Sequence, residues 1–314
     1  MRPVYQRAPV NLNRHETTAF CAAAFAVVLW GLLPILRLQA GAVPPLLMTA
    51  IALAFAALMD TLRAWAVELG SAGAGDGEGD AAGRTSLPLG RGLVLAGTLV
   101  GAIGFYFVGL DWAPAARVTL ITYVWPLMFV VASEVLTLGR VRGVVLAGCA
   151  VAFAGSAALV AEGGGAIAWR DGLGYLAGLL SGVCWVVYSL ALRQGPTLGP
   201  GAWPRLFTLG AAAALALHLL LEPAAWPLSA QALGISAAIG VGPYGLAFVA
   251  WAYGVRRGPA RAVGALAYAV PFVASGVLIA MGNAEPSWRF ALGGATIVAG
   301  IALANRPGRR AERA

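Results

Sequence analysis

The sequence contains no lysine and little charge of either sign. Of its 314 residues, 11% are charged and 60% are apolar. Because a soluble protein carries about 25% charged residues, this composition excludes a soluble protein and also a single-anchor enzyme with a large soluble domain. The apolar residues suffice for about nine or ten membrane helices of about 20 residues each.

The residue types that the chain lacks exclude several kinds of functional site. Without lysine there is no Walker A P-loop, so we expect no ATP-driven pumping by this chain alone. The two histidines, His15 and His218, form no H-E-x-x-H zinc motif. The three cysteines lie far apart in apolar runs, at positions 21, 149 and 184, and predict neither a disulfide framework nor a metal site. We therefore expect no metal and no cofactor.

Ten apolar stretches of membrane length follow one another along the chain, separated by breaks that carry proline, glycine and charge. They predict an all-α integral membrane protein with ten transmembrane helices, near residues 17–37, 44–65, 90–110, 115–137, 142–161, 173–192, 202–221, 230–252, 261–281 and 289–304. The stretch 70–83, after the second helix, is rich in Gly, Ala, Ser and Asp, and it predicts a flexible cytoplasmic linker.

The 21 basic residues are all arginines, spread between the apolar runs, and they give a net charge of +8. Because they form no continuous basic patch, we expect no nucleic-acid partner. If the N-terminus is cytoplasmic, 17 arginines fall on the cytoplasmic side and four on the outer side, namely Arg37, Arg117, Arg170 and Arg289. This positive-inside bias predicts that both termini are cytoplasmic.

The spacing of glycine, proline and tyrosine indicates an internal repeat. A shift of 145 residues aligns the third and fourth helices with the eighth and ninth, pairing Gly97 with Gly242, Gly109 with Gly254, Pro114 with Pro259, Tyr123 with Tyr268 and Pro126 with Pro271. We predict two five-helix repeats, 1–165 and 166–314. Because five is odd, the second repeat is inverted in the membrane. Inverted repeats typically build secondary transporters that work by alternating access to a central cavity.

Certain motifs resemble those of a known family. They are Trp30-Gly31 in the first helix, and the turn Asp111-Trp112-Ala113-Pro114-Ala115 followed by a helix with Pro126. Over roughly residues 15–305 the chain resembles the drug/metabolite transporter superfamily, EamA type, and within it the bacterial aromatic amino acid exporters. The resemblance implies a basket of helices around a central cavity, with the fifth and tenth helices often peripheral, in the bacterial inner membrane.

The fourth and ninth helices carry hydroxyl groups and helix-breaking prolines on one face. These residues are Thr119, Thr122, Tyr123 and Pro126 in the fourth helix, and Tyr268, Pro271 and Ser275 in the ninth. Hydroxyl groups are costly in lipid, and broken helices are tolerated where they line protein or water. We therefore predict that this face lines the cavity; the alternative is packing between helices. Trp125 lies about 200° around a regular helix from Tyr123, so we expect the two to face different ways.

Other candidate residues lie inside or near the ends of spans. The predicted cavity wall also includes Trp30, Tyr106, Ser181, Trp185, Tyr188 and Trp251. Glu134 lies within the predicted fourth span, and a carboxylate inside the membrane is a candidate for proton coupling. The alternative for Glu134 is an interfacial ion pair with Arg140 or Arg142. Gly174, Gly178 and Gly182 form a small-xxx-small pattern that favours internal packing over a dimer interface.

These features together predict a secondary transporter, not an enzyme, that exports small metabolites, foremost amino acids including aromatic and apolar ones. We expect membrane lipid and a small-molecule substrate as partners, and a monomer or weak homodimer. One alternative is an antiporter for anionic or sugar-linked metabolites, which would need paired basic residues; only Arg37 and Arg117, at span ends, come close. The other alternative is a membrane enzyme, but the spans contain no set of residues that would form a catalytic site. We expect no fixed charge within the spans to bind a substrate carboxylate.

Overall fold

The computed structural model describes residues 14–72, 87–160, 169, 171–199, 201–224 and 227–306, and its regular secondary structure in these ranges is entirely helical. In the first half the helices are α1 (Arg14–Gly31), α2 (Leu33–Gln39), α3 (Pro45–Ala72), α4 (Leu89–Trp112), α5 (Ala115–Thr122), α6 (Trp125–Leu138) and α7 (Gly143–Val160). In the second half they are α8 (Asp171–Gln194), α9 (Ala202–Leu221), α10 (Ala230–Ile239), the π-helix η2 (Gly240–Leu246), α11 (Ala247–Arg257), α12 (Ala260–Leu266), the 3-10 helix η3 (Ala267–Ala269), α13 (Val270–Ala280) and α14 (Trp288–Ala304).

Eight helical segments of the described chain are long and apolar enough to cross a membrane. The predicted fifth and tenth spans are also apolar helices, over 143–158 and 288–304, but they are shorter. At 1.5 Å per residue α14 is about 26 Å long, slightly less than the roughly 30 Å of a hydrocarbon core. The protein is therefore an all-α membrane protein, with eight full-length candidate spans and two shorter helices.

The helix boundaries in the two halves follow the same register. α5 and α12 begin 145 residues apart, at Ala115 and Ala260, as do α6 and α13, at Trp125 and Val270. α7 and α14 begin at Gly143 and Trp288, again 145 residues apart. α3 differs from the prediction, because it continues to Ala72 and so includes the first residues of the predicted 70–83 linker. The rest of that linker lies outside the described residues.

Prolines account for the broken helices near the middle of the molecule. Pro34 follows the break between α1 and α2, Pro126 the break between α5 and α6, and Pro271 the break between η3 and α13. Pro243 lies inside η2. Proline has no N–H to donate and its ring clashes with the preceding turn, so it interrupts the ladder of backbone hydrogen bonds and frees carbonyls there.

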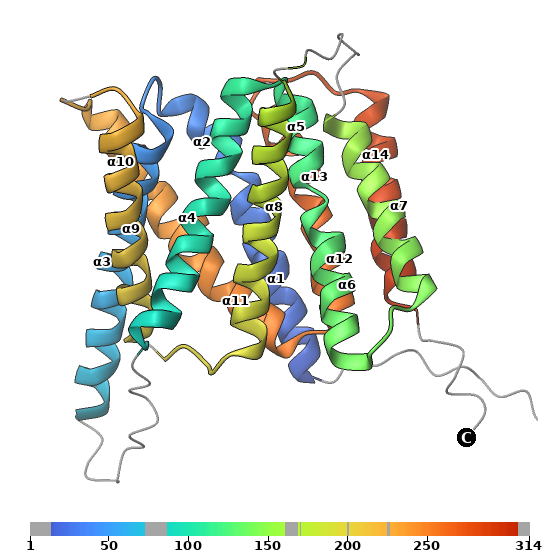
Figure 1. Cartoon of the computed structure of the whole chain (residues 1–314), viewed down its shortest axis with the longest axis horizontal. Helices are drawn as coiled ribbons and strands as arrows, with labels where there is room; N and C mark the ends of the chain where they lie inside the picture. Colours follow the sequence, from blue (N-terminus) through green and yellow to red (C-terminus); the bar gives the residue numbers. More distant parts are fainter. Residues whose placement is uncertain are drawn as a thin grey trace, which may run out of the picture.

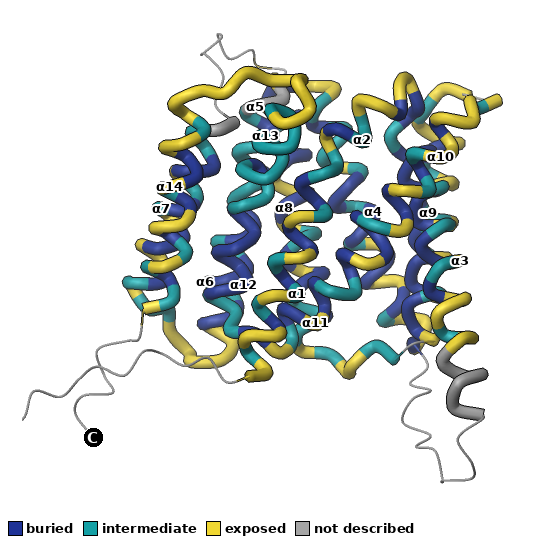
Figure 2. The backbone as a smooth tube through the Cα atoms, turned by 180° about the vertical axis from the view of Figure 1, so that it is seen from behind, coloured by how far each residue is buried: buried dark blue, intermediate teal, exposed yellow. Residues whose placement is uncertain are grey.

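The helices pack as pairs in a single layered bundle (Figure 1). α7 packs against α14 at one side, and α3 packs against α9 at the other. Between these pairs, α4 contacts α8 and α1 contacts α11. Figure 2 shows buried positions between the helices and many exposed positions on their outer faces. Several of the exposed side chains are large and apolar, as expected for a lipid-facing surface, including Leu58, Leu93, Leu176, Leu220 and Val298.

Small residues permit the close contact between α7 and α14. A Cβ atom added to Gly300 would lie 2.7 Å from the Cα atom of Ala152, where no real Cβ fits. In α8, Gly178 and Gly182 pack against the Val118 and Thr122 carbonyl oxygens, each 3.1 Å from an added Cβ. The glycine pattern of α8 therefore serves internal packing, as predicted.

We predict that Gly300→Ala destabilises the folded protein, because the added methyl group would force α7 and α14 apart. Overpacking of this kind costs about 1–3 kcal/mol, which should lower the melting temperature in detergent. Gly97→Ala is the matched control, since nothing lies within 4 Å of a Cβ at Gly97. A Gly300→Ala protein as stable as the Gly97→Ala protein would contradict the close contact.

Candidate functional site

A cavity of about 490 Å³ lies between elements of both halves of the sequence. Its wall is formed by α1 and α2, the C-terminal half of α4, α5 and the start of α6, α8, the α10–α11 segment, and η3 and α13. These elements place it in the half of the bundle that contains α2, α5 and α13, at the upper end of Figure 1. This volume is in the range of pockets that bind small molecules.

The structure brings eight of the predicted site residues together on the cavity wall. They are Trp30, Tyr106, Thr119, Thr122, Tyr123, Trp185, Pro271 and Ser275. They come from five separate helical segments, which only the fold could bring together. The wall also contains residues that the sequence analysis did not select, foremost Arg37, Trp125, Tyr244 and Phe248. Tyr244, Phe248 and Trp251 are spaced i, i+4, i+7, a helical signal that could have indicated them.

Trp125 and Tyr123 both line the cavity, so the expectation that they face different ways was wrong. The expectation assumed one regular helix. α5 ends at Thr122 and α6 begins at Trp125, and the helical phase is not continuous across this break. The backbone N–H of Val124 donates to Ile121 O at 3.1 Å, a tight turn ahead of Pro126.

The remaining predicted residues lie outside the cavity lining. The Ser181 hydroxyl donates to Ala102 O at 2.6 Å and so joins α8 to α4. Trp251 is fully buried, and its Nε1–H donates to the Ser189 hydroxyl at 3.2 Å. Tyr188 and Tyr268 are also fully buried, and the ring of Tyr268 lies 5.9 Å from that of Phe153 in α7. The helix-break residue Pro126 is buried beside the wall without lining it.

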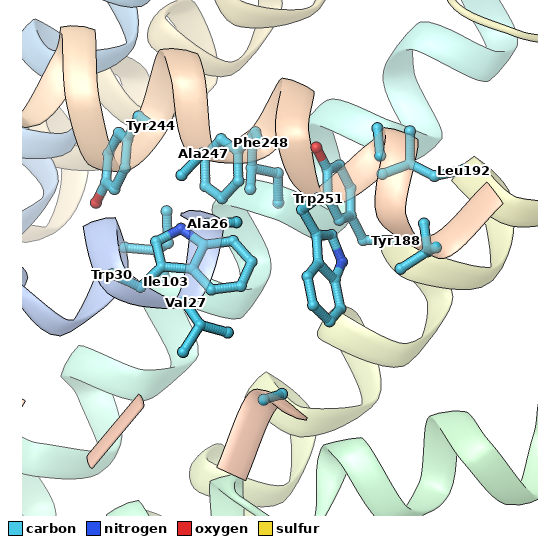
Figure 3. Close-up of a cluster of buried hydrophobic side chains, with 14 of the residues drawn as sticks. Ala26, Val27, Trp30, Ile103, Tyr188, Leu192, Tyr244, Ala247, Phe248 and Trp251 are labelled. Carbon is cyan, nitrogen blue, oxygen red and sulfur yellow. The ribbon is translucent and has the colours of Figure 1, made fainter. Parts of the chain in front are cut away.

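A cluster of aromatic rings borders the cavity, and we call it the aromatic floor. Figure 3 shows its members Trp30, Phe248 and Trp251. The ring centroid of Trp30 lies 5.8 Å from that of Trp185, 5.9 Å from Phe248 and 5.2 Å from Trp251. Trp125 lies 6.0 Å from Trp185 and 5.8 Å from Trp251. Tilted and edge-on pairs at these distances each contribute about 0.5–1.5 kcal/mol beyond burial. The cluster is therefore a well-packed part of the molecule beside the cavity.

Side chains of the cavity wall donate hydrogen bonds to backbone carbonyls of neighbouring elements. The indole Nε1–H of Trp30 donates to Pro243 O in η2 at 2.9 Å. The Thr122 hydroxyl donates to Gly178 O in α8 at 3.0 Å. Higher on the wall, the Tyr106 and Thr119 hydroxyl oxygens lie 2.8 Å apart and share a hydrogen bond. These three bonds fix the orientation of four wall residues, Trp30, Tyr106, Thr119 and Thr122.

Below the aromatic floor, the C-terminal ends of α8 and α11 lie together. An arginine of each helix donates hydrogen bonds to carbonyl groups at the end of the other helix. Arg193 of α8 donates to the Val255 carbonyl, and to Gly258 O at 3.1 Å. Arg256 of α11 donates to the Gly195 carbonyl, and to Leu192 O at 2.9 Å. C-terminal carbonyls have no partner within their own helix and attract cations. We call Arg193, Arg256 and these carbonyls the arginine clasp; it closes the end of the bundle opposite the cavity.

Glu134 forms an ion pair outside the cavity. Its carboxylate is buried in α6 and accepts hydrogen bonds from the Arg142 side chain, including Nε at 3.0 Å, and from the backbone N–H of Arg142 at 3.1 Å. The hydrogen bond with Glu134 raises the pKa of the Arg142 guanidinium above its ordinary value. Gly139, with φ of 66°, makes the left-handed turn that brings Arg142 back to α6. This arrangement agrees with the interfacial ion pair.

Known proteins with similar sequences are membrane transporters. Residues 172–306 match the model of the EamA-like transporter family. The aromatic amino acid exporter YddG of Ancylobacter novellus is 35% identical over 289 residues, which cover 91% of this chain and 96% of that protein. The chain therefore belongs to the EamA-like transporter family, as its sequence motifs predicted.

Two further comparisons agree with this family. A probable terminal-alkyne amino-acid exporter of Streptantibioticus cattleyicolor is 30% identical over 235 residues, covering 68% of this chain and 74% of that protein. A solved crystal structure matches with a TM-score of 0.79 and 32% identity, covering 92% of this chain and 97% of that one. The chain is thus a multi-pass bacterial membrane transporter, and its relatives are named exporters rather than enzymes.

We predict that Glu134→Gln lowers stability but leaves the transport rate per folded molecule unchanged. The substitution removes the charge that binds Arg142, which should cost about 1–3 kcal/mol. Thermal unfolding in detergent measures the loss, and Arg142→Gln should cause a similar one. Because the two residues act as one pair, the double variant should be less destabilised than the sum of the single variants. Loss of pH-dependent transport in Glu134→Gln would instead support proton coupling.

Proposed function

We propose that this protein is a secondary transporter that exports amino acids, including aromatic and apolar ones, across the bacterial inner membrane. The observation that carries the proposal is the aromatic-walled cavity, which lies between the two halves of the chain and is closed at one end. Its rings, from Trp30, Trp125, Trp185 and Phe248 among others, suit the apolar side chain of a small substrate. The names of the two exporter relatives support the same substrate class.

Transport proceeds by alternating access between two inverted five-helix repeats, 1–165 and 166–314. The 145-residue register of the helix boundaries supports this, because related halves should begin their helices at equivalent positions. The helix contacts support it as well: α4 with α8 is the counterpart of α11 with α1, and α3–α9 and α7–α14 pair equivalent helices. Inverted repeats of this kind exchange conformations around a central site.

The described conformation is open on the outer side. Most arginines lie at the end of the bundle that holds the arginine clasp, and positive-inside bias assigns that end, with both termini, to the cytoplasm. The cavity then faces outward, while the aromatic floor and the clasp separate it from the cytoplasm. The opposite state requires the clasp to open and the outer ends of α2, α4 and α13 to close together.

An anion antiporter has less support. Such a site needs paired basic residues, and among the described residues of the cavity wall only Arg37 is charged. Arg117 binds the Tyr175 hydroxyl at 3.3 Å instead of facing the cavity.

Exchange of labelled amino acids across liposomes that contain the purified protein tests the proposed function. We expect liposomes loaded with unlabelled phenylalanine to accumulate labelled phenylalanine, tryptophan and leucine faster than empty liposomes do. Loading with phosphate or a sugar phosphate should not stimulate uptake. Absence of exchange for every amino acid tested, or strong stimulation by a sugar phosphate, would overturn the proposal.

We predict that Tyr123→Ala lowers transport strongly while insertion into the membrane stays normal. Tyr123 lines the cavity, so truncation removes part of the substrate-binding surface. A loss of about tenfold in kcat/KM, equivalent to about 1.4 kcal/mol, is expected. Tyr268→Ala should have a smaller or similar effect on transport, because Tyr268 packs behind the wall on Phe153. Tyr253→Ala is the matched control, since Tyr253 is exposed on the outer face of α11; equal transport by Tyr123→Ala and Tyr253→Ala would exclude Tyr123 from the site.

We predict that removing the arginine clasp exposes the floor of the cavity to the cytoplasmic side. In a variant without native cysteines, Ser189→Cys places a thiol at a fully buried position between the floor and the clasp. It should react slowly with a charged maleimide applied from the cytoplasmic side. Adding Arg193→Gln and Arg256→Gln should raise the labelling rate about tenfold or more, because the carbonyls at both helix ends lose their partners. Arg205→Gln, outside the clasp, serves as control and should leave the rate unchanged.

A further inference from the structure

Arg37 is the one charged residue on the described cavity wall. Arg37 lies in α2, which begins after the break at Leu32. The direction of the Arg37 side chain therefore cannot be predicted from the rotation per residue along α1. Its guanidinium donates to Gly41 O at 2.7 Å and to Val43 O at 2.9 Å. These two carbonyls hold the side chain in one position at the edge of the cavity.

The positive charge of Arg37 has no carboxylate partner in the described part of the chain. Ion pairs there include Arg63 with Asp60 and Arg142 with Glu134, and neither involves Arg37. A guanidinium has five N–H donors, and the backbone carbonyls engage two of its nitrogen atoms. Donors therefore remain for an anion in the cavity, and a planar carboxylate matches the geometry of the fork.

Arg37 and part of the aromatic floor line the same cavity. Trp30 and Arg37 are seven residues apart, on the two sides of the break between α1 and α2. A substrate with its carboxylate at Arg37 would extend its side chain toward Trp30, Trp185 and Phe248. The wall has no acidic residue among those described, so a second positive charge on the substrate would find no partner there.

We infer that Arg37 is the specificity-determining residue for the substrate carboxylate, and that the site selects neutral zwitterions or monocarboxylates with an apolar side chain over amines. This inference rests on the proposed function. It also revises the expectation, drawn from the sequence, that the spans offer no charge for a carboxylate. The hydroxyl groups of Tyr106, Thr119 and Tyr123 provide oxygen acceptors for the ammonium group on the same wall.

Competition during labelled phenylalanine exchange tests the role of Arg37. In the unmodified protein, unlabelled phenylalanine and 3-phenylpropionate should compete, whereas phenylalanine amide and phenethylamine should compete at least tenfold more weakly. Arg37→Gln should abolish this preference for carboxylates. Arg37→Lys should restore part of it, because lysine keeps the charge but not the fork. Arg289→Gln, at the exposed start of α14, is the matched control and should keep the full preference.

The ratio between competitors separates binding from a purely structural role. If Arg37 only held the backbone at Gly41 and Val43, its variants would lose transport of all substrates in equal proportion, and the inference would be overturned. An unchanged carboxylate preference in Arg37→Gln would also overturn it, with the proposed function intact. Absence of exchange in the unmodified protein would instead refute the proposed function. If Arg37→Gln does not insert into the membrane, the same competition ratio is measured for Arg37→Lys. A weakened preference for carboxylates supports the inference, and an unchanged preference overturns it.

Discussion

A membrane helix must satisfy its own backbone hydrogen bonds, and a transport cavity requires helices that are broken within the membrane. This conflict governs much of the architecture, because the hydrocarbon core offers no water to a freed carbonyl. Side chains from neighbouring segments bind backbone carbonyls in the interior of the bundle and at helix ends. Trp30 binds Pro243 O, Thr122 binds Gly178 O, and the arginine clasp binds the ends of α8 and α11.

The same principle operates at the outer helix ends. The Glu222 carboxylate, at the end of α9, accepts from the backbone N–H groups of Leu46 and Leu47 at 2.8 and 3.1 Å, and so caps the start of α3. His218 lies 2.9 Å from the same carboxylate. His218 and Glu222 thus join α9 to α3 on the side of the bundle away from α7 and α14. The pairs of helices at the two sides hold the frame within which the central helices are broken.

Much of the fold could be predicted from the sequence, because an apolar run bounded by proline, glycine or arginine leaves little freedom in where a membrane helix begins. α9 spans the predicted 202–221, and α14 begins one residue from its predicted start. The end of α3 was harder to predict, because the small and polar residues near Ala72 resemble a linker although they continue the helix. The fifth and tenth helices were predicted nearly to their observed bounds, but both are shorter than the eight full-length candidate spans.

The direction of a side chain is easier to predict within an unbroken helix than across a break, but its depth is not, because Ser181 and Tyr188 of the regular helix α8 lie outside the cavity lining. Trp30 and Trp185, in regular helices, lie on the wall as expected. Trp125 and Arg37 follow breaks, where the 100° rotation per residue no longer applies, and their directions depend on tertiary contacts. Tyr268 illustrates a second difficulty: its sequence partner Tyr123 faces the cavity while Tyr268 faces α7. Two positions related by the 145-residue register need not have the same surroundings in a single conformation.

The chemistry of the arginine clasp bears on how export is coupled to energy. Its donors are guanidinium groups, which stay charged at any physiological pH, and its main acceptors are backbone carbonyls, which do not titrate. A closure built from carboxylates would loosen on protonation, but this one has no group that a proton could neutralise. The strength of the clasp is therefore insensitive to proton concentration over the physiological range. A proton gradient would have to act on export through some other part of the molecule.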